Sequence, residues 1–172
     1  MTKLIFVTTT CPFCSGGVSG NYDFGYVDGS FKVGKAPLLV TASSPADGVY
    51  GAPVPAVTAS YIGFVYGQGS SALTSAPSCS TTYTHVAGSG PGTYSTSCTG
   101  GVSGNYYFSY FGGSFKVGKA PLQVTASNPA DGVYGDPVPA ITASYIGFVY
   151  GQGSSALTTA PTCSTTYTQV AG

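Results

Sequence analysis

Hydrophobic and polar residues alternate along short stretches of this chain, and no stretch repeats with the period of an α-helix. In "YDFGYV" (residues 22–27) every second side chain is aromatic, and "SFKV" (residues 30–33) continues the alternation. Asp28 and Gly29 lie between them, and an Asp-Gly pair between alternating runs favours a tight turn. The pattern predicts a β-hairpin here and a second one at residues 106–118, where two glycines replace the Asp-Gly pair.

Several other runs have the residues typical of strands and are separated by Gly, Pro and Ser. They are "APLLVTAS" at 36–43, its near-copy "APLQVTAS" at 120–127, "PAVTASYIGF" at 55–64, "SCSTTYTHV" at 78–86 and "GTYSTSC" at 92–98. A proline is tolerated at the start of a strand, where its missing N–H is not needed. The whole chain is therefore expected to be all-β.

The chain contains an internal repeat. Residues 15–88 match residues 99–172 at an offset of 84 positions, with 12 differences among the 74 positions compared. One difference replaces His85, the only histidine, with Gln169. A site that each repeat needed would not tolerate that change, so we expect His85 to be a loop or strand-surface residue.

Charge is unusually scarce. The chain has 5 Lys, 5 Asp, no Arg and no Glu, and its formal net charge is zero. Such a chain has no field to attract nucleic acid or an anionic membrane, and it lacks the repulsion that keeps proteins apart. With 42% apolar and 13% aromatic residues it can still bury a core. Self-association is plausible on these grounds.

No apolar run approaches the roughly 20 residues of a membrane-spanning helix. The run "LIFV" near the N-terminus is shorter than the apolar region of a secretory signal. Five cysteines in a small chain favour an oxidising compartment. We expect an extracellular or cell-surface location, with any signal sequence outside this chain.

The segment from Gly104 to Cys163 resembles the MBG repeat of the YGX type, which occurs in tandem in bacterial surface and adhesin-like proteins. The resemblance covers nearly all of the chain after residue 14. The resemblance lies in "NYxFxYxxGxFxVxKAPL", in Tyr-Gly-Asp-Pro at 134–137 and in "YIGFVYGQGSSAL" followed by "TxAP". It implies tandem Ig-like β-sandwich modules on a surface protein, and it implies no catalytic residues. The cysteines are a departure from what we expect of most such repeats.

In that family's frame a module runs from one "KAPL" to the "FKV" before the next. Residues 35–118 then form one complete module. Residues 119–172 form the first part of a second module that lacks its last strands, and residues 1–34 supply the C-terminal strands of a split module. The ends of the chain are thus expected to fall inside modules and not between them. Residues 1–34 become a candidate donor segment, that is, a segment whose strands complete a module of another molecule.

Cys79 and Cys98 lie 19 residues apart on two predicted strands of the complete module. Neither has a base or a cation beside it in the sequence, so a structural disulfide is favoured over reactive thiols. By the loop-entropy model such a bridge stabilises the fold by about 3 kcal/mol.

The offset of 84 residues relates Cys163 to Cys79 and Cys14 to Cys98. The N-terminal segment of one molecule is therefore a candidate to complete the C-terminal module of another by strand addition, with a Cys163–Cys14 disulfide between chains. This predicts a partner that is the protein itself, joined head to tail as a filament. Two alternatives stay open, namely an excerpt of a longer array and a single chain closed on itself.

Cys11 is predicted to be unpaired, because Ser95 stands at the corresponding position. The run "KLIFVTTTCPFC" resembles the opening strand and active-site turn of glutaredoxin-like proteins, so a thioredoxin-like redox enzyme using Cys11 and Cys14 is a remote alternative. A helix normally follows the first cysteine and lowers its pKa, whereas a glycine-rich segment follows here.

We identify no catalytic, metal-binding or cofactor-binding residues, and we expect no cofactor. One His with scattered Asp gives neither a metal-ligand set nor an acid–base pair. The alternating tyrosines favour core packing, although a module that binds a surface glycan or a protein is an alternative of another class. The sequence thus predicts a non-enzymatic structural or adhesive protein.

Overall fold

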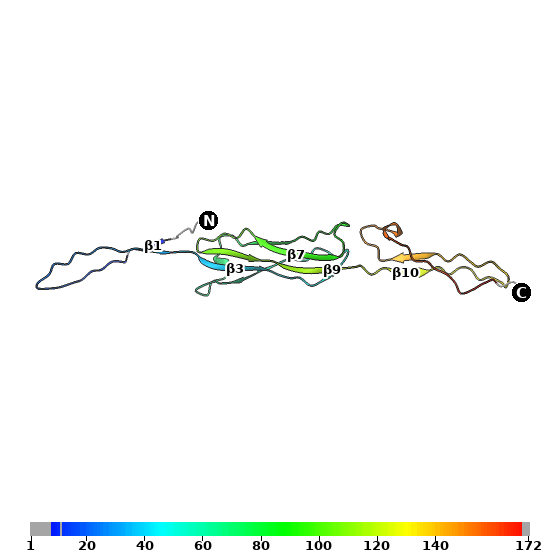
Figure 1. Ribbon diagram of the computed structural model, residues 1–172, viewed down its shortest axis with the longest axis horizontal. Helices are drawn as coiled ribbons and strands as arrows, with labels where there is room; N and C mark the ends of the chain where they lie inside the picture. The colour runs from blue at the N-terminus through cyan, green and yellow to red at the C-terminus, as the bar shows by residue number, and fades with distance from the viewer. Residues whose placement is uncertain (1–7, 11, 170–172) are drawn as a thin grey trace. The chain divides into compact units, whose positions relative to one another are not determined.

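The structure, a computed structural model, describes residues 8–10 and 12–169, and in these residues the predicted all-β fold is confirmed (Figure 1). The described helical segments are two single 3₁₀ turns, η1 (Ser70–Ala72) and η2 (Ser154–Ala156). The strands are β1 (Thr8–Thr10), β2 (Phe31–Val33), β3 (Ala36–Ala42), β4 (Gly48–Val49), β5 (Ala59–Ile62), β6 (Ser78–Thr81), β7 (Gly92–Thr99), β8 (Tyr106–Phe111), β9 (Gly113–Gly118), β10 (Gln123–Ala126) and β11 (Ala143–Ile146).

The described strands form four sheets. One has the order β5-β3-β8, another the order β4-β9-β7-β6, and β1-β2 and β10-β11 are two-stranded. β3 is antiparallel to β5 but parallel to β8, with Ala36 opposite Tyr106 and Thr41 opposite Phe111. β3 is therefore a central strand that has a hydrogen-bonded neighbour along each of its edges.

Contacts divide the chain into two compact units. The first contains residues 1–45, 55–82 and 95–114, and the second contains residues 46–54, 83–94 and 115–172. The predicted module of residues 35–118 contributes segments to both units. The module boundaries at 34/35 and 118/119 remain predictions from the repeat.

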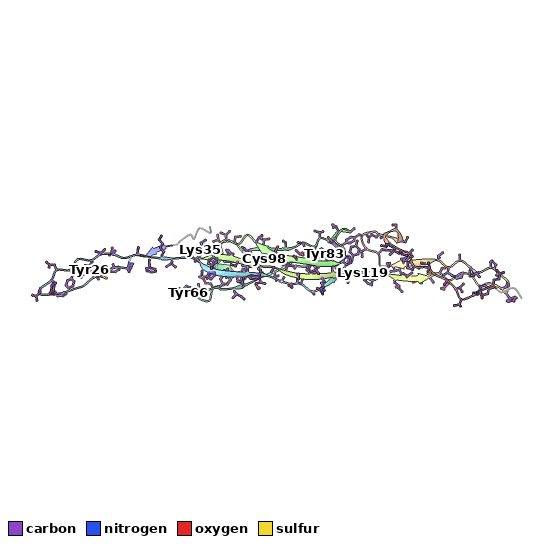
Figure 2. All side chains as sticks on the ribbon, viewed as in Figure 1. Tyr26, Lys35, Tyr66, Tyr83, Cys98 and Lys119 are labelled. Atoms are coloured by element: carbon purple, nitrogen blue, oxygen red, sulfur yellow. A yellow bond between two sulfur atoms is a disulfide. The ribbon has the colours of Figure 1, made fainter. Side chains whose placement is uncertain are left out.

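The core of the first unit lies along β3. Leu38, Val40 and Ala42 point to one side and are almost completely buried, as the alternation of side chains in a strand requires. Val40 and Ala42 pack with Cys98 of β7, which is labelled in Figure 2. The disulfide is thus part of the apolar core of this unit.

The core of the second unit is aromatic. Tyr83, labelled in Figure 2, packs edge-on against Tyr94 and Phe115, with ring centroids 5.0 and 6.0 Å apart. Val117 completes the buried cluster. The Tyr83 hydroxyl donates a hydrogen bond of 2.8 Å to the carbonyl oxygen of Ala52, so its polar end is satisfied.

Local backbone structure repeats with the sequence. β10 pairs with β11 in the register in which β3 pairs with β5, with Gln123 opposite Ile146 and Leu39 opposite Ile62. The non-glycine residues with positive φ also match, Tyr66 at 55° and Tyr150 at 56°. The second repeat therefore keeps this strand pair and this turn, although β10 hydrogen-bonds only to β11 among the described residues.

The hairpin predicted at residues 106–118 is wrong: both strands form, but β8 pairs with β3 and β9 lies in the other sheet, between β4 and β7. The chain passes from one sheet to the other at Gly112 instead of turning back on itself. The hairpin predicted at residues 22–33 is also wrong: β2 forms but pairs with β1, and residues 22–27 are not a strand. The sequence alternates equally well in both places. Residues 106–111 form a strand because β3 lies beside them, whereas no strand of the described residues lies beside residues 22–27.

None of the described residues forms a helix long and apolar enough to cross a membrane.

The buried position of Leu38 gives a test of the fold. Leu38→Ala is expected to lower the free energy of unfolding by about 2–5 kcal/mol, because it leaves a cavity in the core of β3. Ile62→Ala on the neighbouring strand is the control, since Ile62 is 70% exposed and its loss should cost far less. Denaturant unfolding measures both; equal losses for the two variants would contradict this packing.

Candidate functional site

Cys79 and Cys98 form the predicted disulfide. They lie directly opposite each other on β6 and β7, with Cα atoms 4.0 Å apart and an S–S distance of 2.05 Å. Cys98 is 2% exposed, so the bridge is covered by the core of the first unit. The geometry is that of a structural bridge between neighbouring strands.

The other cysteines are not joined within the described chain. Cys14 is exposed and Cys163 is half-buried, and both are free thiols. Cys11 lies outside the described residues, so its predicted unpaired state stays a prediction. The predicted bridge between Cys14 and Cys163 of different molecules also remains a prediction. The residues from Cys14 to Ser30 form no helix.

Tyr106 is the most enclosed aromatic side chain of the first unit, with 1% of its surface exposed. Its hydroxyl accepts a hydrogen bond of 3.1 Å from the Val65 N–H and donates one to the Gln68 side-chain oxygen. Its ring meets Phe64 edge-on at 5.3 Å. Nearby, the Lys35 ammonium donates to the Ser103 carbonyl oxygen at 2.7 Å. These contacts hold the start of β8 beside β3.

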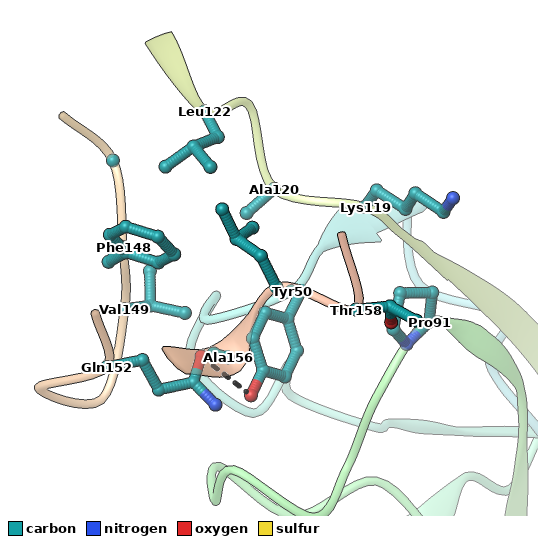
Figure 3. Close-up of a pocket in the computed structure, with 12 residues that line it drawn as sticks. Tyr50, Pro91, Lys119, Ala120, Leu122, Phe148, Val149, Gln152, Ala156 and Thr158 are labelled. Atoms are coloured by element: carbon teal, nitrogen blue, oxygen red, sulfur yellow. Dashed lines mark hydrogen bonds between the residues drawn. The ribbon is translucent and has the colours of Figure 1, made fainter. Parts of the chain in front are cut away.

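An open cavity of about 350 Å³ lies in the second unit (Figure 3). We call it the Gln152 cavity. Its apolar wall includes Leu122, Phe148, Val149 and Leu157. The Gln152 amide oxygen accepts a hydrogen bond of 3.4 Å from the Tyr50 hydroxyl, drawn as the dashed line in Figure 3. The cavity thus offers an apolar space with one amide at its side.

A second cavity of about 540 Å³, which we call the Tyr167 cavity, lies in the same unit. It is lined by residues 130–134 and 136–139 together with Tyr167. The Tyr167 hydroxyl donates to the Asp136 carbonyl oxygen at 3.1 Å, and the Asp136 carboxylate accepts from the Val133 N–H at 2.8 Å. Neither cavity was predicted from the sequence. The signal for them is the 84-residue offset, by which residues that line the cavities correspond to core residues of the first repeat.

His85 is exposed, as predicted, and its Nε2 donates to the Gly51 carbonyl oxygen at 3.0 Å. Gln169, its counterpart, donates from Nε2 to the Gly135 carbonyl oxygen, also at 3.0 Å. The substitution therefore preserves one hydrogen bond to the backbone. Among the described residues no three His, Cys, Asp or Glu side chains lie close enough together to hold a metal ion.

Among the described residues, the Tyr150 hydroxyl is the one group whose pKa is clearly shifted. Burial of its hydroxyl, together with the neighbouring Tyr83, raises the pKa of Tyr150 from 10.0 to about 12. Its ring contacts Tyr50 edge-on at 5.3 Å and His85 at 5.2 Å. The position belongs to an aromatic cluster of Tyr50, His85 and Tyr150.

The disulfide gives a stability test. Replacing Cys79 and Cys98 together by Ser is expected to lower the free energy of unfolding by about 3 kcal/mol, since the 19-residue loop is no longer closed in the unfolded chain. Cys163→Ser, which breaks no bond within the chain, is the matched control. Denaturant unfolding under non-reducing conditions measures the difference; a loss no larger than that of the control would contradict a structural role.

Tyr150 gives a pH test. The neutral phenol is favoured in the folded state, so its stabilising effect is complete below pH 10 and is lost as the pH rises toward about 12. The free energy of unfolding should therefore fall over this range, and Tyr150→Phe should make the fall smaller. Denaturant unfolding at a series of pH values checks this, with the exposed Tyr107→Phe as control. The same fall in both variants would contradict the assignment.

Residues 38–116 match the family model of the MBG domain (YGX type). The resemblance expected from the sequence is confirmed for this segment, and the match indicates a repeat module of the kind found in adhesin-like surface proteins. None of the curated proteins and none of the solved structures compared with the chain matches it.

Proposed function

We propose that this chain is a non-enzymatic structural protein of the extracellular surface, built from MBG-like modules, and that its molecules join head to tail by strand addition. The match of residues 38–116 to a domain of surface repeat proteins supports the location and the structural role. The assembly is supported mainly by one observation, which is that β10 hydrogen-bonds to a single strand, β11, among the described residues.

β3 has strand neighbours on both sides, whereas β10 has only β11 among the described residues. An unpaired strand edge leaves N–H and C=O groups that another strand can satisfy. In the repeat, the strand that would take the place of β8 beside β10 is residues 22–27, which lie 84 positions before β8. The chain therefore carries both an open edge and a segment with the sequence to cover it.

The cysteines support the same pairing. Cys163 and Cys14 are free, and they correspond to the bonded pair Cys79 and Cys98. If residues 22–27 of one molecule lie beside β10 of another as β8 lies beside β3, Cys14 and Cys163 come to face each other. Oxidation would then lock each junction with a disulfide between chains.

Donor and acceptor surfaces lie on different parts of the chain, so the contact is heterologous. Such contacts continue into a filament unless the rotation between molecules closes a ring. A chain with a formal net charge of zero offers little repulsion against growth. The junction disulfides would make the product resistant to dilution and to denaturant.

Exposed aromatic residues favour assembly over a ligand-binding surface. Tyr22 is 77% exposed, whereas its counterpart Tyr106 is 1% exposed. Phe31 is 54% exposed, whereas Phe115 is 4% exposed. The counterparts of both side chains are buried where β8 and β9 are paired with other strands. Packing against a second molecule therefore explains why Tyr22 and Phe31 are exposed here, without a glycan ligand.

The assembly has a direct test. Purified protein in an oxidising buffer is expected to run as a ladder of oligomers on a non-reducing denaturing gel and as a single band after reduction. Electron micrographs should show filaments or rings, and peptide mass spectrometry should identify a Cys14–Cys163 crosslink. Cys163→Ser should abolish the ladder, because it removes one partner of each junction.

A single monomer band in which Cys14 and Cys163 are both free thiols would refute head-to-tail assembly. A monomer that contains the Cys14–Cys163 bond would instead show a chain closed on itself. Turnover in a disulfide-reductase assay that Cys11→Ser abolishes would refute the non-enzymatic role.

A further inference from the structure

We propose that the two cavities of the second unit receive the aromatic side chains of residues 22–33 of a second molecule. Tyr22 fills the Gln152 cavity and sets the register of the junction, and Phe31 fills the Tyr167 cavity. This inference rests on the proposed head-to-tail assembly and names the side chains that would give it specificity.

The wall of the Gln152 cavity repeats the surroundings of Tyr106 at an offset of 84 residues. The matching pairs are Phe148 with Phe64, Val149 with Val65, and Gln152 with Gln68. In the first unit the members of this set enclose the Tyr106 ring and bind its hydroxyl. The residue that lies 84 positions before Tyr106 is Tyr22, so the chain carries the same side chain in an exposed position.

The polar groups of the cavity fit a tyrosine. By analogy with Tyr106, the Tyr22 hydroxyl would accept from the Val149 N–H and donate to the Gln152 amide oxygen. That oxygen also accepts from Tyr50, and a carbonyl oxygen has lone pairs for both. Lys119, which lines the cavity, would bind the Ser19 carbonyl oxygen as Lys35 binds that of Ser103.

The Tyr167 cavity repeats the aromatic core of the second unit in the same way. Tyr167 corresponds to Tyr83, against which Phe115 packs edge-on at 6.0 Å. Phe31 lies 84 positions before Phe115 and is 54% exposed. Phe31 of a second molecule is therefore the side chain with the chemistry and position to fill this space.

Two local contacts of the donor segment match those of its buried counterpart. The Gly17 N–H donates to the Tyr26 hydroxyl at 2.7 Å, as the Gly101 N–H donates to Tyr110 at 3.0 Å. The Phe24 and Tyr26 rings stack at 6.3 Å, close to the 6.1 Å of the corresponding pair on β8. These two contacts are formed before association, so they need not be ordered on binding, which favours affinity.

The backbone around the Gln152 cavity is also fixed in the single molecule. Gly63 and Gly147 have φ angles of 117° and 119°, and a Cβ atom at either position would collide with the carbonyl oxygen of Pro37 or Pro121. The turn that contains Phe148 and Gln152 is thus packed closely against Pro121, which precedes β10. The cavity has its shape before a tyrosine arrives.

A tyrosine in the Gln152 cavity also selects one register. Sliding the added strand by one residue would turn Tyr22 to the opposite face and place Asp23 toward the apolar wall. A slide by two residues would replace Tyr22 with Phe24, whose ring has no hydroxyl for the Val149 N–H and the Gln152 oxygen. The Tyr22 hydroxyl therefore distinguishes the correct register from its neighbours.

The test uses the full chain with Cys11, Cys14 and Cys163 replaced by Ser, so that association is reversible. Sedimentation over a range of concentrations gives the dissociation constant of the junction. Tyr22→Ala should raise it about a hundredfold or more, and Tyr22→Phe about tenfold, because the phenylalanine fills the cavity but loses both hydrogen bonds. Tyr22 is exposed in the single molecule, so neither change threatens the fold.

Two further variants make the comparison specific. Tyr107→Phe removes a hydroxyl from the exposed neighbour of Tyr106 and should leave the dissociation constant unchanged. Gln152→Ala combined with Tyr22→Phe should weaken association less than the product of the two single effects, because both remove the same hydrogen bond.

The outcomes separate this inference from the proposed function. If the parent chain associates and Tyr22→Ala associates equally well, the inference is overturned while head-to-tail assembly stands. If the parent chain stays monomeric at all concentrations, and the chain with its cysteines also gives no ladder, both are overturned.

Discussion

The parallel pairing of β3 with β8 is the interaction on which the rest of the structure depends. It covers the second edge of β3, places Tyr106 against Phe64 and buries Leu38 and Val40. β3 joins its sheet neighbours across a long stretch of sequence, since β8 begins 64 residues after β3 ends at Ala42. The module is therefore completed only when its last strands return beside its first.

The second repeat shows what the same residues do without that partner. β10 keeps the register with β11, and the turn at Gly147 keeps its conformation, so local hydrogen bonding suffices for these elements. The long-range partner is what is missing: Leu122 is half-buried where Leu38 is fully buried, and cavities lie where aromatic side chains pack in the complete arrangement. In the proposed filament a second molecule restores this packing.

The sequence predicts the local elements well and the long-range ones poorly. Alternation correctly located the strands β3, β5, β8 and β9, because strands with one buried face leave that pattern. It wrongly predicted that β8 and β9 pair as a hairpin, since they lie in different sheets. The disulfide of Cys79 and Cys98 followed from their spacing on adjacent strands. The parallel pairing of β3 with β8 leaves no local pattern, so neither the failure of residues 22–27 to form a strand nor the two cavities could be foreseen from composition and alternation. The repeat offset was the signal that relates Tyr22 to the surroundings of Tyr106.

Amide hydrogen exchange of residues 22–27 tests the central claim most directly. In the assembled protein these amides should exchange slowly, together with those of β10, because each segment completes the other's hydrogen bonding. In the dissociated protein, with the cysteines replaced and the concentration low, they should exchange rapidly. Equally rapid exchange in both states would show that residues 22–27 do not lie beside β10, and it would contradict strand addition as the basis of the assembly.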